Sequence, residues 1–164
     1  QASAVATNMV GMTAIMASTA VSVLAVFNAG GRILAGFLSD RIGRINTLSV
    51  ASVAGIAGLL LLYITGQGGF ATFYIGIACI GISFGSFMGV YPGFTADQFG
   101  GKNNSVNYGI MFIGLAGAGY FGPSAMRKIY MTDGAYTRAF LVAVAFAAAG
   151  FVLTFIYRFF AKKK

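Results

Sequence analysis

The sequence contains no histidine, no tryptophan and no glutamate, and it has a single cysteine, Cys79. One cysteine cannot build a disulfide framework, and without histidine the metal sites based on His and Cys ligands are excluded. Three aspartates remain as candidate general bases, and all of them fall in predicted loops, which does not indicate an enzyme. We therefore expect no enzymatic activity, no bound metal and no cofactor.

Charge is scarce as well. Only 9% of the 164 residues are charged and 58% are hydrophobic, whereas about a quarter of a soluble domain is charged. So few charges cannot cover a surface that faces water, and the high hydrophobicity excludes a disordered chain. The net charge of +8 does not indicate a nucleic-acid partner, because the basic residues lie between apolar runs and at the C-terminus. The remaining class is an all-α, polytopic membrane protein in a lipid bilayer.

Long uncharged runs give the number of spans. A bilayer core about 30 Å thick needs roughly 20 apolar residues per helix, and the runs 1–31 and 45–96 contain no charged residue. The Gly-rich stretch 66–69 divides the second run into two spans. The predicted spans are 12–38, 46–66, 70–95, 105–126 and 137–158.

The opening stretch of the chain does not resemble a signal peptide, because it has no basic start. We interpret it as the end of an earlier helix, in a chain cut from something longer.

Basic residues between the spans predict the orientation. One side carries three of them, Arg127, Lys128 and Arg138. The other side carries seven, which are Arg41, Arg44, Lys102, Arg158, Lys162, Lys163 and Lys164. The bias predicts a multi-pass protein of the plasma (inner) membrane, with the N-terminus outside and the C-terminus in the cytoplasm.

Glycines recur at helical spacing in two of the spans. Gly81, Gly85 and Gly89 share one face of the third span. Four glycines also gather just before Pro123 in the fourth span, and these are Gly114, Gly117, Gly119 and Gly122. Such residues let helices approach closely in lipid, so we expect tight packing there. A sliding gate helix is the alternative, helped by the proline.

Residues 36–44 form the most specific motif in the chain. They include Gly36, Asp40, Arg41, Gly43 and Arg44, spaced as Gly-x-x-x-Asp-Arg-x-Gly-Arg between two spans. This resembles the loop signature of the major facilitator superfamily, which lies on the cytoplasmic side. We expect Asp40 to pair with one of the two arginines or with a neighbouring helix N-terminus, and the group to serve gating and structure. A plain polar loop is the alternative.

A second resemblance narrows the family. The stretch 96–109, the run Asn-Ala-Gly-Gly-Arg at 28–32, and Gly122 with Pro123 are similar to the oxalate/formate antiporter family, which includes bacterial monocarboxylate transporters. The resemblance implies that the five spans are the eighth to twelfth helices of a twelve-helix transporter. It also implies that this is the C-terminal bundle and that the N-terminal half is absent from this sequence.

Arg32 is the leading candidate for substrate binding. It lies eight residues before Asp40, which is about 12 Å along a helix and so near the bilayer midplane. A charge there costs at least ~2.5–3.5 kcal/mol and needs a partner, but no aspartate of this chain lies at that depth. A carboxylate matches a guanidinium in a bidentate manner, so we expect a bound anion. Snorkelling to the interface, or an acid on the missing half, are the alternatives.

Asn28 lies one helical turn before Arg32, on the same face, and we expect it to assist in binding. An amide cannot titrate, so a co-transported proton would need another group. Exchange against a counter-anion is the alternative. Further candidates for lining the cavity are Tyr120, Ser83, Ser86 and Phe84.

The sequence thus predicts secondary active transport of small organic carboxylates such as lactate, pyruvate or formate by alternating access. A single intramembrane cation favours a monocarboxylate, and an oxalate/formate-type exchanger is the first alternative. An anion channel and a membrane scaffold that transports nothing are alternatives of another class.

Overall fold

The computed structural model describes residues 2–161, and all regular structure in that range is helical. The predicted cytoplasmic residues Lys162, Lys163 and Lys164 lie outside the described range. Five of the six helices are long and apolar enough to span a membrane, which confirms the predicted fold class. The helices are α1 (Ala2–Asn8), α2 (Ala14–Ile42), α3 (Arg44–Ile64), α4 (Phe70–Phe99), α5 (Asn104–Asp133) and α6 (Thr137–Ala161). Each predicted span overlaps one of the five long helices.

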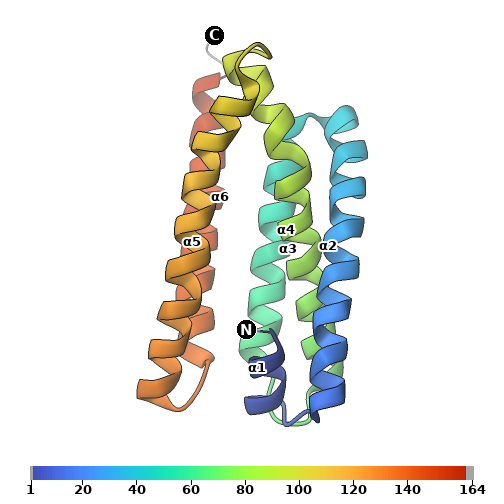
Figure 1. Ribbon diagram of the computed structural model, residues 1–164, viewed down its shortest axis with the longest axis vertical. Coiled ribbons are helices and arrows are strands. Elements are labelled where there is room, and N and C mark those ends of the chain that lie inside the picture. Colours follow the sequence, from blue (N-terminus) through green and yellow to red (C-terminus); the bar gives the residue numbers. More distant parts are fainter. Residues whose placement is uncertain (1, 162–164) are drawn as a thin grey trace.

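The α2–α3 and α4–α5 connections lie at the same end of the bundle as the last turn of α6 (Figure 1). The motif 36–44 was expected to contain the loop between the spans 12–38 and 46–66, but the structure keeps the motif helical except for Gly43. Gly43 has φ 84°, a left-handed value that costs glycine little and lets α2 reverse into α3 within one residue. Gly36 lies within α2, as the predicted span 12–38 implied, whereas Asp40 and Arg41 lie on the last turn of α2 rather than in a loop.

The glycine face predicted on α4 packs directly against α2. A Cβ atom on Gly85 would overlap the carbonyl oxygen of Asn28, and one on Gly89 would lie 3.0 Å from the carbonyl oxygen of Arg32. Gly81 approaches the backbone of α2 in the same way. Only glycine permits this contact, so the spacing of four residues fixes how α4 supports the part of α2 that carries Asn28 and Arg32.

The glycines of α5 are different from those of α4. A Cβ atom on Gly114, Gly117, Gly119 or Gly122 would meet no atom within 4 Å, and α5 buries no residue. The expectation of tight packing at these positions is therefore not met within residues 2–161. The reason is that α5 makes few contacts with the other helices of this chain.

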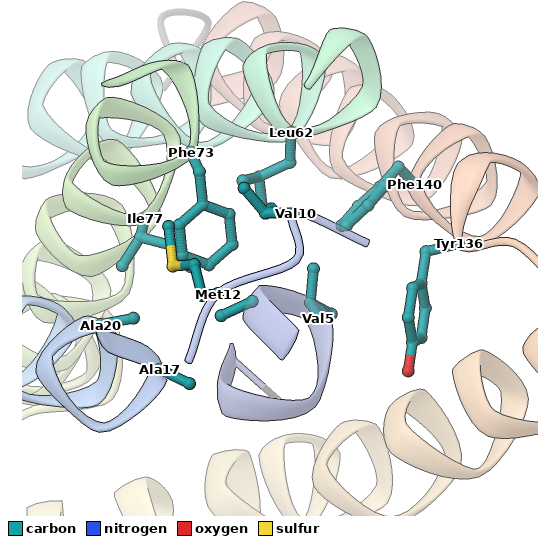
Figure 2. Packing of buried hydrophobic residues seen from close by; sticks show 11 residues of the cluster. Val5, Val10, Met12, Ala17, Ala20, Leu62, Phe73, Ile77, Tyr136 and Phe140 are labelled. Carbon is teal, nitrogen blue, oxygen red and sulfur yellow. The ribbon is translucent and has the colours of Figure 1, made fainter. Parts of the chain in front are cut away.

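The largest apolar cluster lies at the opposite end of the bundle and joins five helices (Figure 2). Short helix α1 contributes Val5, which packs with Phe73 of α4 and Phe140 of α6 in this cluster. Val10 and Met12, on the segment that leads from α1 into α2, are also buried in this cluster. The opening stretch is thus a short helix that closes this end of the bundle.

Candidate substrate site on α2

Arg32 and Asn28 lie on one face of α2, as their spacing predicted. The Nε atom of Arg32 donates a hydrogen bond to Oδ1 of Asn28 at 3.2 Å. The Arg32 side chain is exposed, and neither of the two ion pairs formed within residues 2–161 includes it. Its charge therefore has no acidic partner in the described part of the chain.

The bond to Asn28 determines which edge of the guanidinium is available. A guanidinium has five N–H donors, and the Asn28 amide oxygen accepts from the one on Nε. The four donors on the two Nη atoms have no acceptor among residues 2–161. These two atoms form a planar fork that fits the two oxygens of a carboxylate. Asn28 thus holds the Nε edge of Arg32 and leaves its terminal edge available to a ligand.

A cavity of about 340 Å³ lies between α4 and α5. Its walls are mainly aromatic side chains and methionines, and Tyr91 and Tyr108 bring hydroxyl groups to it. Arg32 lies close enough to Tyr108 to interact with it electrostatically, although Arg32 is not itself part of the wall. The full lining is Phe84, Phe87, Met88, Tyr91, Tyr108, Met111, Phe112, Gly114 and Leu115.

A second cavity of about 300 Å³ lies among α3, α4 and α6. Of the four residues predicted to line a cavity, Phe84 lines both of these cavities and Ser83 lines the second. Ser86 lines neither: its hydroxyl is buried and donates to the carbonyl of Ile82 at 2.7 Å. Tyr120 also lines neither and is 71% exposed on α5.

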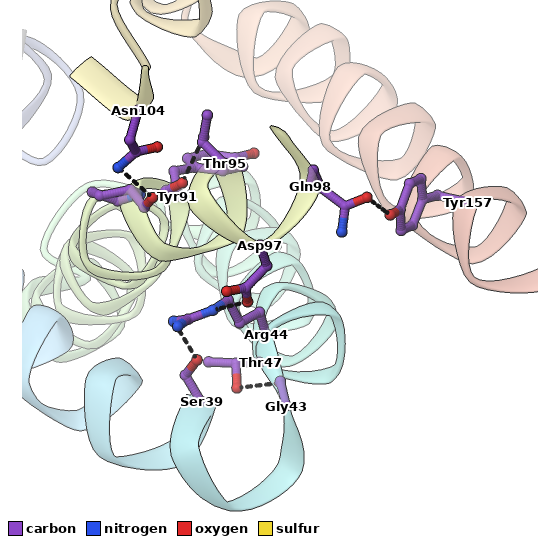
Figure 3. A network of polar contacts seen from close by, with 11 residues as sticks. Ser39, Gly43, Arg44, Thr47, Tyr91, Thr95, Asp97, Gln98, Asn104 and Tyr157 are labelled. Carbon is purple, nitrogen blue, oxygen red and sulfur yellow. Dashed lines mark hydrogen bonds and ion pairs between the residues drawn. The ribbon is translucent and has the colours of Figure 1, made fainter. Parts of the chain in front are cut away.

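The charged motif at the end of α2 makes a contact that the sequence did not predict. Arg44, the first residue of α3, forms an ion pair with Asp97 on the last turn of α4, and its Nη1 atom lies 3.4 Å from the Ser39 hydroxyl (Figure 3). A Cβ atom on Gly93 would overlap the Arg44 guanidinium, so this glycine makes room for the pair. The ion pair therefore links the motif to α4.

The prediction that Asp40 pairs with one of the two arginines of the motif was wrong. Arg44 pairs with Asp97 instead of Asp40, because Gly43 turns the first residue of α3 toward α4. Arg41 lies over the ring of Phe37, with its Cζ atom 4.4 Å from the ring centroid. Asp40 is exposed and makes no hydrogen bond or ion pair with another residue of the range 2–161. Asp40 and Arg41 thus take no part in the Arg44–Asp97 ion pair.

Two known proteins show what this chain is similar to. The "Uncharacterized MFS-type transporter YhjX" of Escherichia coli (strain K12) is 29% identical over 111 residues, which cover 68% of this chain and 27% of that protein. The "Oxalate:formate antiporter" of Oxalobacter formigenes is 30% identical over 148 residues, 87% of this chain and 35% of the antiporter. The chain therefore spans about a third of the length of these relatives.

The family model of the Major Facilitator Superfamily matches residues 2–164, nearly the entire sequence. The five long apolar helices and the motif that ends α2 agree with that match. This chain belongs to the Major Facilitator Superfamily.

Proposed function

We propose that this chain is the C-terminal bundle of a secondary transporter for small organic carboxylates, in which Arg32 binds the carboxylate. The observation that carries this proposal is the state of Arg32: its Nε atom is held by Asn28, and its Nη donors have no partner among residues 2–161. A lone guanidinium at membrane depth costs at least ~2.5–3.5 kcal/mol. An anion on the Nη fork offsets that cost, and midplane binding is where secondary transporters hold substrate.

The charge inventory favours a monocarboxylate such as lactate, pyruvate or formate. Arg32 is the one basic residue in the membrane-embedded part of α2, and the predicted span 105–126 of α5 contains none. A dicarboxylate would favour a second cation. The aromatic cavity between α4 and α5 offers an apolar wall for the rest of the substrate.

Exchange of one anion for another is the second candidate mechanism. It is supported by the relative named as an oxalate:formate antiporter. It is also supported by Asn28, because an amide cannot carry the proton that symport requires at that position. If a proton is co-transported, it would travel on the substrate or on a group of the N-terminal half.

Alternating access requires a second bundle against which this one rocks. The outward faces of α2 and α5 are apolar and exposed, with Ile33 at 75% and Ile113 at 70%, so each can contact lipid or that bundle. The partner would be the N-terminal half of the same transporter. The end that carries Arg41, Arg44 and the C-terminus would face the cytoplasm, in the plasma (inner) membrane.

Counterflow in proteoliposomes tests the proposal. The complete transporter that carries this chain is reconstituted, loaded with unlabelled lactate, formate or oxalate, and supplied outside with the labelled anion. We expect saturable counterflow, with monocarboxylates preferred. An anion channel would give flux without counterflow, and a scaffold would give no flux, so either result would contradict the proposal.

A further inference from the structure

A third cavity lies at the end of the bundle where the α2–α3 turn, the end of α4 and the C-terminal turn of α6 meet. Its volume is about 350 Å³, which is within the range of small-ligand sites. Unlike the two intramembrane cavities, it is lined by charged side chains, Arg44, Asp97 and Arg158, together with the amides Asn46 and Gln98. These residues lie on the first turn of α3 and on the last turns of α4 and α6, so this cavity is at the ends of the candidate spans rather than midway along them.

The hydrogen bonds around this cavity leave an excess of positive charge and of donors. Asp97 is paired with Arg44, so its negative charge is balanced. Gln98 accepts a hydrogen bond from the Tyr157 hydroxyl on its Oε1 atom, which leaves its amide nitrogen as a donor (Figure 3). Arg158 has no ion pair or hydrogen bond to another residue of the range 2–161. The unbalanced group is therefore the Arg158 guanidinium, and its complement is an anion.

The location favours a phosphate group. Arg41 and Lys102 lie at the same end of the bundle, and three more lysines follow α6 in the sequence. Basic pockets between helix ends at a membrane surface bind phospholipid headgroups, and a guanidinium can donate two parallel hydrogen bonds to one phosphate.

We propose that this cavity binds the phosphate of an anionic phospholipid, with Arg158 as the principal contact and Gln98 as a second donor. The proposal requires only that this end of the bundle lies at headgroup depth, so it does not depend on the function of Arg32.

Native mass spectrometry of the complete transporter in detergent tests this. The protein is titrated with phosphatidylglycerol, with phosphatidylcholine, and with soluble glycerol phosphate as a competitor. Arg158→Gln is the test variant. Lys128→Gln is the matched control, because it removes one positive charge from an exposed residue of α5, nearer the opposite end of the bundle. Arg158→Lys keeps the positive charge but loses the two parallel N–H donors of the guanidinium.

We expect wild type and Lys128→Gln to retain phosphatidylglycerol in preference to phosphatidylcholine, and Arg158→Gln to bind it about fivefold more weakly. Should Arg158→Gln elute as an aggregate, Arg158→Lys carries the test, with binding reduced about twofold or more. Unchanged binding by the variant that folds, or equal retention of both lipids, overturns the site. If glycerol phosphate displaces phosphatidylglycerol at equal concentration, the site binds a soluble phosphate, and the proposal that its ligand is a lipid is overturned.

Discussion

The Nε atom of Arg32 donates to Oδ1 of Asn28 at 3.2 Å, and the terminal edge of the same guanidinium is left without an acceptor in the described part of the chain. Both residues lie on the stretch of α2 that the glycine face of α4 supports. The Arg32–Asn28 hydrogen bond spans one turn of α2, but the position of that turn depends on the close approach of α4 to α2. This relationship connects the packing of the bundle to the proposed binding of a carboxylate.

Asn28→Asp should weaken transport in a way that depends on pH. An ionised carboxylate at this position pairs with Arg32 and competes with the substrate for the guanidinium. Arg32 lowers the pKa of the new carboxyl group, whereas desolvation at membrane depth raises it, so uptake should recover only toward the acid end of the pH range, where protonation removes the competitor. The measurement is initial uptake of labelled lactate between pH 5 and 8, in wild type and variant. A variant whose ratio to wild type does not rise as pH falls would contradict the competition.

Asn28→Ala separates orientation from charge. The alanine removes the acceptor that holds Nε but introduces no competing group, so the guanidinium samples more orientations. We expect a higher apparent KM at every pH, by about five- to tenfold, which corresponds to about 1–1.4 kcal/mol and lies within the net contribution of a typical hydrogen bond. Saturation curves for lactate uptake measure this. Kinetics identical to those of wild type would show that the hydrogen bond has no role in binding.

Gly85→Ala should disturb the α2–α4 contact. The added methyl group overlaps the carbonyl oxygen of Asn28 and meets backbone atoms that cannot move aside alone. Overpacking of this kind costs about 1–3 kcal/mol, and it shifts the turn that carries Arg32. The measurements are thermal stability in detergent and lactate uptake, both of which should fall.

Gly150→Ala is the control for that substitution. Gly150 is also helical, but a Cβ atom there meets nothing within 4 Å. It should leave stability unchanged or slightly raised, because alanine favours helix more than glycine does. Equal losses of thermal stability in both variants would show that the close contact at Gly85 does not set this position apart from an open helical glycine.

The Arg44–Asp97 pair should contribute little to stability by itself. Its side chains are 33% and 54% exposed, and pairs of this kind contribute about 0–1 kcal/mol. Gly93→Ala should cost more, because the methyl group displaces the Arg44 guanidinium.

A double-mutant cycle tests that explanation. In the Asp97→Ala background the guanidinium has lost its acidic partner and can move aside more easily, so Gly93→Ala should cost less than it does in wild type. Thermal stability of the four proteins measures the difference. Additive effects would contradict the idea that Gly93 acts through Arg44.

The sequence predicted the five helices because apolar length is a local property, readable in any run of about 20 residues. The Gly81 to Gly89 face was also predictable, since a spacing of four residues places side chains on one side of a helix. The ends of the helices were harder to predict from the sequence, because α2 continues through the polar residues of the motif up to Gly43.

The contacts between helices show where the sequence was insufficient. Asp97 lies 53 positions after Arg44, and no local pattern indicates which of two arginines approaches it. The glycines of α5 were predicted to pack, but their neighbours are not among residues 2–161. For the site, the spacing predicted that Asn28 and Arg32 share a face, whereas the choice of Nε as the donor emerged only from the structure.

The central claim is that the Arg32 fork binds a carboxylate, and Arg32→Lys tests it most directly. Lysine keeps the positive charge but cannot form two parallel hydrogen bonds. The measurement is counterflow of labelled lactate and formate by the complete transporter, at matched expression, with Arg138→Lys in the exposed α5–α6 region as control. The account predicts a loss of roughly tenfold or more for Arg32→Lys and wild-type counterflow for the control. Wild-type counterflow by Arg32→Lys would contradict the account.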